Sequence, residues 1–417
     1  MQEIYTMSSK ELDKLSTIKS VVMCKLTQVG AAKHLGLSER QIRRLKQKYL
    51  AEGESGFCSK KRGKHSNREY SSTLRTLAMN LIQEHFYDYG PTLAAEKLAE
   101  YFGIQISKET ARQWMIASGL WHPFQKPERK LHPSRERRPC FGELIQIDGS
   151  DHAWFEDRGP KCTLLVFIDD ATSTLTALRF VEAETTLGYF SAFKNHLSYY
   201  GVPMSFYSDK HGVFKVNHPA AKSGNGLTQF GRALKSFNVQ IIFAHSPQAK
   251  GRVERVNATL QDRLVKELRF HKISDIDTAN KFLETFRKKF NQRFAKRARL
   301  SVDLHRPMSE RESSELDRTL SIQTQRTISK DMLVRHNKNI FKIIAPGQVN
   351  RLSQAKVMVC ESLSGEITIF HKNQSLHYEV YKKGLHTDQI FNRKEINNHL
   401  SKLNALERRW NKNVASL

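Results

Sequence analysis

A change of hydrophobic period at Phe141 constrains the fold more than any other feature of this chain. The short apolar runs ELIQID, KCTLLVFIDD and TLTALRFV follow one another there and predict three consecutive strands. Helical and strand-like patterns then alternate, in TLGYFSAFKNHLSYYG, PMSFYSD, LTQFGRALKSF, VQIIFAH and GRVERVNATLQDRLVKELRF. Three strands joined by short turns, followed by strands that alternate with helices, predict a mixed five-stranded sheet with helices on both faces.

Two of these predicted strands end in an aspartate. Asp148 closes the first strand and Asp209 closes the fourth, where a carboxylate can reach a cleft without being fully buried. Glu254 lies near the start of the last, long helix. It falls beside the apolar stripe of that helix, which consists of Val253, Val256, Leu260, Leu264 and Leu268. We therefore expect Glu254 at the rim of the sheet, with Asn257 and Gln261 on the same stripe.

Three carboxylates that meet at one rim repel one another unless a cation joins them. Mg²⁺ and Mn²⁺ prefer oxygen ligands and keep positions open for phosphate and water. Two such ions, about 3.5–4 Å apart, can activate an attacking oxygen and stabilise a leaving one. The pattern predicts phosphodiester chemistry at Asp148, Asp209 and Glu254.

The charge of the chain predicts a polyanionic partner. The formal net charge is +26, while the hydrophobic content of 39% is high enough for packed domains. Arg252 and Arg255 flank Glu254, and Lys250 precedes them in a turn that contains glycine. Two interpretations stay open: these cations contact a DNA backbone, or the arginines form an exposed, salt-bridged helix end around Glu254.

The segment LTQVGAAKHLGLSERQIRRLKQKYL predicts a helix–turn–helix. Gly36 permits the turn, and Ser38 with Gln41 forms a capping box that starts the second helix. The exposed side of that helix carries the expected DNA contacts Arg40, Gln41, Arg43 and Arg44. The alternative is an ordinary helical hairpin with a solvated basic face.

Composition divides the rest of the chain. We expect a helix–turn–helix domain over 1–57, a basic linker over 58–71, a second helix–turn–helix domain over 72–121, a basic linker over 122–140, the catalytic core over 141–300, a linker over 301–324, a small β-barrel over 325–385 and a basic tail over 386–417. The five cysteines form no C-x-x-C pair, which argues against a zinc ribbon or a disulfide framework. No run approaches 18 apolar residues, so we expect neither secretion nor membrane insertion.

The blocks ELIQIDG, SFYSDKHGVF and SPQAKGRVERVNATLQDRLVKEL resemble the three signature blocks of DDE integrases and transposases. Within that superfamily the chain resembles insertion-sequence transposases of the ISNCY group over nearly its whole length. The resemblance implies an RNase-H-like core, a catalytic triad of Asp148, Asp209 and Glu254, and two Mg²⁺ or Mn²⁺ ions. Asp170, in the block FIDDATS, matches a turn of the family and not the triad. The zinc-binding N-terminal domain of retroviral integrases has no counterpart here, so DNA recognition is expected to rest on the two helical units.

The resemblance implies a multi-domain DNA transposase that acts as a homo-oligomer on DNA in the bacterial cytoplasm. It would bind the terminal inverted repeats of an insertion sequence, cleave at the 3′ ends and join them to target DNA. The alternative is a sequence-specific DNA-binding regulator whose core no longer cuts. A structure-specific nuclease is disfavoured, because such an enzyme has no need of paired helix–turn–helix units.

Overall fold

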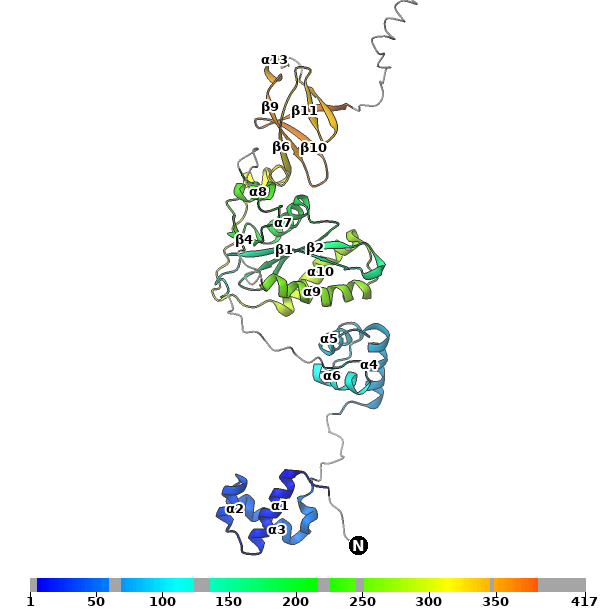
Figure 1. Ribbon diagram of the computed structural model, residues 1–417, viewed down its shortest axis with the longest axis vertical. Coiled ribbons are helices and arrows are strands. Elements are labelled where there is room, and N and C mark those ends of the chain that lie inside the picture. Colours follow the sequence, from blue (N-terminus) through cyan, green and yellow to red (C-terminus); the bar gives the residue numbers. More distant parts are fainter. Residues whose placement is uncertain are drawn as a thin grey trace, which may run out of the picture. The chain divides into compact units, whose positions relative to one another are not determined.

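The computed structural model describes residues 6–59, 69–123, 136–216, 226–244, 251–345 and 349–381 (Figure 1). The chain forms two compact units, Met1–Pro123 and Phe124–Leu417. Most of the two expected basic linkers and the whole expected tail lie outside the described residues.

The first helical bundle contains the predicted helix–turn–helix. Its elements are α1 (Ser9–Val22), α2 (Gln28–Leu35), α3 (Glu39–Glu52) and a short 3₁₀ helix (Gly53–Phe57). Ala31 and Ile42 are fully buried between the helices, and Gly36 ends α2 with a left-handed φ of 62°, which a residue with a Cβ adopts at a cost. The capping box of Ser38 and Gln41 is present at the start of α3.

The second helical bundle follows the same plan. It contains α4 (Ser72–His85), α5 (Pro91–Phe102) and α6 (Lys108–Ala117). Gly103, with a φ of 68°, ends α5, and Ser107 caps α6. Met115 is fully buried, while Trp114 is half-buried and meets the edge of Tyr70 at 5.7 Å between ring centroids.

The core of the second unit is a mixed five-stranded sheet in the order β3-β2-β1-β4-β5. Strands β1, β2 and β3 pair antiparallel, and β4 and β5 continue the sheet in parallel from β1. Its strands are β1 (Ile145–His152), β2 (Cys162–Asp169), β3 (Leu175–Val181), β4 (Ser205–Ser208) and β5 (Gln240–Phe243). This topology confirms the RNase-H-like core.

Helices cover both faces of this sheet (Figure 1). One face packs against α7 (Thr186–Tyr200) and α8 (Gln229–Ser236), and the other against α9 (Gly251–Phe270) and α10 (Ile276–Phe294). Successive residues of β2 point to opposite faces, so that Leu165 and Phe167 join the α7/α8 cluster while Leu164 and Val166 join the α9/α10 cluster. The near-continuous burial of β2 follows from this two-sided packing.

The first strand is longer than the sequence predicts. We expected β1 to end at Asp148, but it continues to His152, paired with β2 down to Cys162. The paired residues of β4 lie opposite Ile145 and Gln146 alone. Among the described residues, β1 pairs only with β2 beyond this point, so Asp148 lies in mid-strand where the parallel pairing with β4 stops.

A second sheet of six strands forms the small C-terminal barrel, in the order β6-β9-β10-β11-β8-β7. The two outer strands, β6 and β7, also contact each other, so the sheet is nearly closed. The strands are β6 (Ile322–Thr327), β7 (Leu333–His336), β8 (Asn339–Ile344), β9 (Lys356–Glu361), β10 (Ile367–His371) and β11 (Gln374–Tyr381), with the one-turn helix α13 (Val349–Leu352) between β8 and β9.

The segment expected as a linker over 301–324 is ordered against the core. Asp303 and Arg306 form β-bridges with Phe141 and Val202, and two short helices, α11 (Glu310–Ser314) and α12 (Leu316–Thr319), lead into β6. Polar composition suggested a loose connection, but the polar side chains pair locally, as in the ion pair of Arg306 with Glu312.

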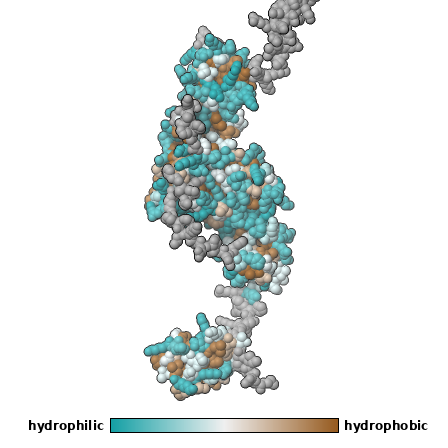
Figure 2. Space-filling view, in the orientation of Figure 1, coloured by the Kyte–Doolittle hydropathy of each residue, from teal (hydrophilic) through white to brown (hydrophobic). Residues whose placement is uncertain are grey.

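The visible face of the molecule is largely hydrophilic, with small scattered hydrophobic patches (Figure 2). Within the described ranges, no helix is both long and apolar enough to cross a membrane.

Candidate active site

Asp148 and Asp209 both follow the parallel pairing of β1 with β4. The last residue pair between these strands is Gln146 with Tyr207, and Asp148 and Asp209 each come two residues later in the chain. Asp209 directly follows β4, and its Oδ1 accepts a hydrogen bond of 2.9 Å from the backbone N–H of His211.

Glu254 lies in the first turn of α9, and its side chain is exposed. The helix is fixed to β1 through the residues that follow on the same stripe. The amide Nδ2 of Asn257 donates to Oδ2 of Asp148 at 3.0 Å, and Nε2 of Gln261 donates to Oγ of Ser150 at 3.1 Å. Glu254 precedes Asn257 by one turn, so it lies along β1 near Asp148.

The three carboxylates do not surround a common point in this structure. Within the described ranges, no group of three His, Cys, Asp or Glu side chains is arranged to hold a metal ion. Asp148 and Asp209 both follow the last parallel pair of β1 and β4, while the side chain of Glu254 is exposed on its helix.

Glu184 is an acidic residue of this region that the sequence analysis missed. Its carboxylate lies against the α-carbon of Gly149, the residue after Asp148, so that a Cβ built on Gly149 would meet the three carboxylate atoms at 2.8–3.0 Å. The Tyr189 hydroxyl donates to Oε1 of Glu184, and Nδ1 of His211 lies 3.9 Å from the same oxygen. Glu184 therefore lies between the strand that carries Asp148 and the loop that carries Asp209.

The Tyr189 hydroxyl interacts with several of these acids. Burial raises the pKa of Tyr189 most, and the negative charges of Glu184, Asp148 and Asp209 raise it further. A phenol that interacts with all three carboxylates stays protonated and serves as a hydrogen-bond donor. A single acid between a strand and a helix gave no sequence signal, because acids at helix starts are common for reasons of helix stability.

Asp170 and Arg252 form a buried pair behind this rim. Asp170 is fully buried, and its Oδ1 accepts from Nε of Arg252 at 2.6 Å. The Arg252 side chain is 14% exposed. Arg252 therefore pairs with Asp170 inside the protein. This differs from our expectation that Arg252 faces DNA, and also from the alternative that it neutralises Glu254.

Arg255 is exposed one turn further along α9. The pKa of Arg137 is held below its usual value, mainly by burial and then by the like charge of Arg252, with a smaller effect from Arg255. Arg137 therefore lies near both of these arginines. Lys250 lies outside the described residues. Within the first turn of α9, Arg255 is therefore the arginine that faces solvent.

In the first bundle the expected contact residues lie on the outer side of α3. Arg40, Gln41, Arg43 and Arg44 are all exposed. The Oε1 atom of Gln41 accepts from the backbone N–H of Ser38 at 3.1 Å in the capping box, which leaves its Nε2 as the group that could contact a base.

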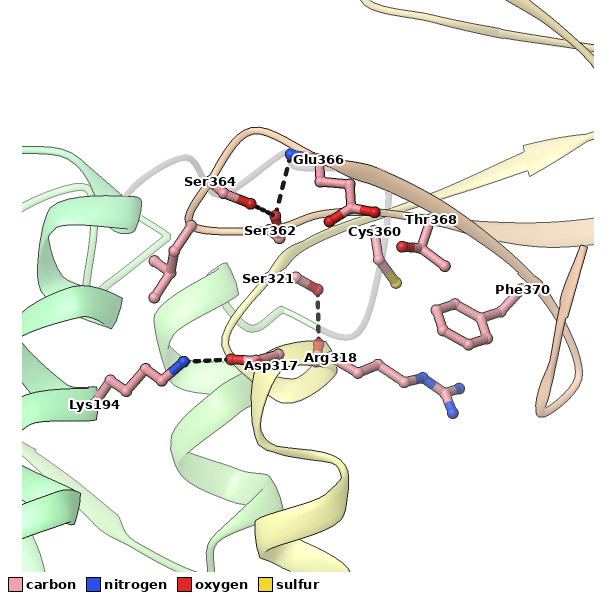
Figure 3. A pocket seen from close by; sticks show the side chains of 11 residues that line it. Lys194, Asp317, Arg318, Ser321, Cys360, Ser362, Ser364, Glu366, Thr368 and Phe370 are labelled. Atoms are coloured by element: carbon pink, nitrogen blue, oxygen red, sulfur yellow. Dashed lines mark hydrogen bonds and ion pairs between the residues drawn. The ribbon is translucent and has the colours of Figure 1, made fainter. Parts of the chain in front are cut away.

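A cavity of about 360 Å³ lies at the junction between core and barrel, and none of the candidate acids lines it (Figure 3). Lys194 of α7 pairs with Asp317 of α12 at 2.5 Å, and the guanidinium of Arg318 lies 4.6 Å from the ring centre of Phe370. These charged and aromatic groups pair with one another across the cavity.

Comparison with known proteins identifies the family. A relative from Sinorhizobium fredii (strain NBRC 101917 / NGR234), "Putative transposase y4bF", is 43% identical over 384 residues, which cover 91% of this chain and 83% of the relative. The "Transposase for insertion sequence IS1202" of Streptococcus pneumoniae is 29% identical over 419 residues, covering 89% and 88%. No family model matches the chain.

Among solved structures, the HTLV-2 integrase catalytic core domain in complex with magnesium is 22% identical and covers 34% of this chain and 82% of its own, with a TM-score of 0.26. A simian T-cell lymphotropic virus intasome in complex with PP2A regulatory subunit B56 gamma is 15% identical and covers 69% and 96%, with a TM-score of 0.32. The assignment rests on the two sequence relatives, which extend over almost the whole chain: it belongs to the family of insertion-sequence transposases.

Proposed function

We propose that this transposase catalyses metal-dependent cleavage and strand transfer of DNA, with Asp148, Asp209 and Glu254 as the catalytic triad. The proposal is supported by two observations: Asp148 and Asp209 each follow the last parallel pair of β1 and β4 by two residues, and the charges of both raise the pKa of Tyr189. Glu254 extends this group from the helix that Asn257 fixes to Asp148.

The donor atoms at this rim fit a hard divalent cation, because carboxylate oxygens dominate them. The Oδ1 atom of Asn257 adds to this fit, since it is buried and has no hydrogen-bond partner among the described residues. Asp148, Asp209 and Glu254 would hold Mg²⁺ or Mn²⁺, as two ions. When bound, such ions lower the barrier for in-line displacement at phosphorus.

The chain's own residues supply the rest of the site. Asn257 orients Asp148 from the helix side, and the His211 N–H orients Asp209 from its loop. In the first step water bonds to the phosphorus at the element end and the P–O3′ bond breaks, which leaves a 3′-hydroxyl on the element and a 5′-phosphate on the flanking strand. In the second step that hydroxyl bonds to a phosphorus of target DNA and displaces the 3′-oxygen of the target strand, so both steps are in-line displacements that one site can serve.

Recognition of DNA would rest on the helical units. In our proposal the terminal inverted repeats bind α3, through Arg40, Gln41, Arg43 and Arg44, because these side chains are exposed together after a capped helix start. Arg255, together with Lys250, would contact the phosphate backbone near the active site. This assignment leaves out Arg252, whose charge is used by Asp170. We also propose that the protein belongs to the ISNCY group, because the motifs GPTLAAEKLAE, RRPCFGELIQIDGS, CTLLVFIDDATS and SPQAKGRVER resemble that group. We propose that it acts in the cytoplasm of a bacterium.

An element has two ends, and each copy of the chain carries one candidate triad. We therefore propose that the protein acts as a homo-oligomer on DNA. Size-exclusion chromatography with light scattering on the complex with paired end DNA should give at least two chains per complex, and a complex of one chain with both ends would contradict the idea.

The triad is tested by Asp148→Asn, Asp209→Asn and Glu254→Gln, each of which removes a charge and keeps the shape. Each variant should lose strand cleavage in Mg²⁺ and keep its affinity for end DNA. Asp262→Asn is the matched control, because Asp262 lies on the same helix with an exposed side chain and pairs with Lys266 instead of belonging to the triad. Its cleavage should stay normal.

Footprinting and cleavage assays on the unmodified protein distinguish the transposase from the alternative function. If the unmodified protein protects the element ends in footprinting but does not cleave them with Mg²⁺ or Mn²⁺, it is a DNA-binding regulator. Near-normal cleavage by any one of the three variants would remove that residue from the triad.

A further inference from the structure

Three separate segments of the core meet at the carboxylate of Asp170. Its Oδ2 accepts from the backbone N–H of Arg138 at 2.8 Å, and its Oδ1 accepts from Nε2 of Gln146 at 2.8 Å and from Nε of Arg252 at 2.6 Å. Arg138 belongs to the segment that enters the core, Gln146 to β1, and Arg252 to the first turn of α9. One fully buried carboxylate thus joins the entry segment, the strand of Asp148 and the helix of Glu254.

Gln146 extends this junction to the backbone of α9. A carboxylate only accepts hydrogen bonds, so the amide nitrogen of Gln146 must face Asp170 and its oxygen must face away. That oxygen, Oε1, accepts from the N–H of Val253 at 3.3 Å. The first N–H groups of a helix lack partners within the helix, and Gln146 satisfies one of them. The first turn of α9 is therefore held at two consecutive residues, and Glu254 comes next.

The entry segment is held at a second point. Nη1 of Arg137 donates to the backbone oxygen of Ala171 and to Oγ of Ser173, both at 2.9 Å. The turn after β2, which contains Asp170, is thus bound to this segment through both Arg137 and Arg138. In the chain this segment follows the linker from the DNA-binding helices.

We propose that Asp170 is a positioning residue, which fixes the first turn of α9 to β1 and to the entry segment and so places Glu254 relative to Asp148. The inference rests on the proposed catalytic role of Glu254. It assigns Arg252 a structural role toward Asp170, where the sequence suggested a contact to phosphate.

The test uses the full-length protein with Asp170→Asn, Arg252→Gln and the double variant. In Asp170→Asn one oxygen becomes an NH₂ donor, so the carboxamide cannot accept from all three partners. Hydrogen exchange of the backbone amides over 251–257 should become faster in each single variant, because the first turn of the helix opens more often. Strand cleavage should fall on the order of 100-fold, as expected when a reacting group is displaced by about 1 Å. Affinity for end DNA should stay within about twofold, because no DNA contact is lost.

The double variant shows whether the two residues act as a pair. If they do, Asp170→Asn with Arg252→Gln should lose no more cleavage than the more severe single variant. Arg255→Gln is the matched control on the same turn. Because Arg255 is exposed, exchange over 251–257 should not change in that variant.

Unchanged exchange over 251–257 in both single variants would overturn the proposal. Weaker end binding by Arg252→Gln, with a shallower salt dependence and normal exchange, would also overturn it and make Arg252 a phosphate contact. If Asp170→Asn fails to fold, the hydrogen exchange of Arg252→Gln over 251–257 still tests the proposal, because Arg252 is less buried than Asp170. Glu254→Gln tests the proposed triad separately, since it should abolish cleavage without changing the exchange.

Discussion

Replacing Asn257 with leucine should separate catalysis from stability. The side chain of Asn257 is buried and donates one hydrogen bond of 3.0 Å, to the carboxylate of Asp148. Leucine has a similar volume, so the packing of α9 on β1 is kept. The substitution therefore removes the hydrogen bond to Asp148 and, with it, the Oδ1 atom of Asn257 that adds to the fit for a metal ion.

The expected loss of activity follows from the strength of that bond. A hydrogen bond to a charged group contributes about 1.5–3 kcal/mol. If Asp148 loses that much of its preference for the competent orientation, cleavage should slow by about 10- to 150-fold, since each 1.36 kcal/mol is a factor of ten. Partners that orient metal ligands elsewhere have effects of about 10- to 100-fold, which agrees with this range.

The free energy of unfolding should change much less. The Oδ1 atom of Asn257 is buried without a hydrogen-bond partner among the described residues, and such a group costs about 1–3 kcal/mol. Leucine removes the destabilising unpartnered Oδ1 and also the stabilising hydrogen bond to Asp148. These two changes in the free energy of unfolding have opposite signs and offset each other. We expect the melting temperatures of Asn257→Leu and the unmodified protein to agree within a few degrees, because their free energies of unfolding should differ by about 1 kcal/mol or less.

The assay is single-turnover cleavage of end DNA across a Mg²⁺ titration, with thermal unfolding measured on the same samples. Gln261→Leu is the matched control, because Gln261 makes the same kind of bond to the same strand but to the neutral hydroxyl of Ser150. It should reduce cleavage by less than about threefold. Equal losses in the two variants, or normal cleavage by Asn257→Leu, would refute the reasoning.

Three further predictions concern other parts of the core. Gly149→Ala places a Cβ 2.8–3.0 Å from the carboxylate atoms of Glu184, which must then move; cleavage should fall in this variant and in Glu184→Gln, and normal cleavage by both would leave Glu184 without a role in the site. The Arg306 side chain lowers the pKa of Glu312 from 4.5 to about 2, so this pair stabilises the fold above pH 4.5 and the stabilisation is lost as the pH falls through about 2. Arg306→Gln should therefore lower the melting temperature at neutral pH, with a difference from the unmodified protein that narrows toward pH 2. The part due to the hydrogen bond from Arg306 to the backbone oxygen of Phe237 should persist, and a difference independent of pH would contradict the reasoning. Leu264→Ala should lower the free energy of unfolding by about 2–5 kcal/mol in denaturant titrations, because Leu264 is fully buried between α9 and the sheet, and a loss under about 1 kcal/mol would show loose packing there.

Local patterns were enough to predict the sheet and the positions of two acids. Strand and helix periods, with the turns between them, identified all five strands of the core. The fourth strand ends at Ser208, one residue before its predicted end at Asp209. Helical spacing also placed Asn257 and Gln261 on one stripe with Glu254, and in the structure both bond to β1. These features depend on residues close together in the sequence.

Other features depend on pairing across the fold and could not be read from the sequence. The extension of β1 beyond Asp148 needs β2 as its partner, because the polar run from Gly149 to His152 has no apolar pattern of its own. The place of Glu184 depends on how α7 packs beside β1. Asp170 looked like an ordinary turn residue, since its three donors come from segments 24 or more residues away.

The two arginines beside Glu254 show why neighbours in sequence need not be neighbours in space. Residues one or two positions apart on a helix do not face each other, so neither Arg252 nor Arg255 is well placed to neutralise Glu254 within the helix. Arg252 points instead to Asp170, whose carboxylate is fully buried and would be costly without a cation. Because Arg252 pairs with Asp170, it fixes α9 to the sheet without pairing with Glu254. Under the proposed function this matters, since a carboxylate already paired with arginine would be a weaker ligand for a metal ion.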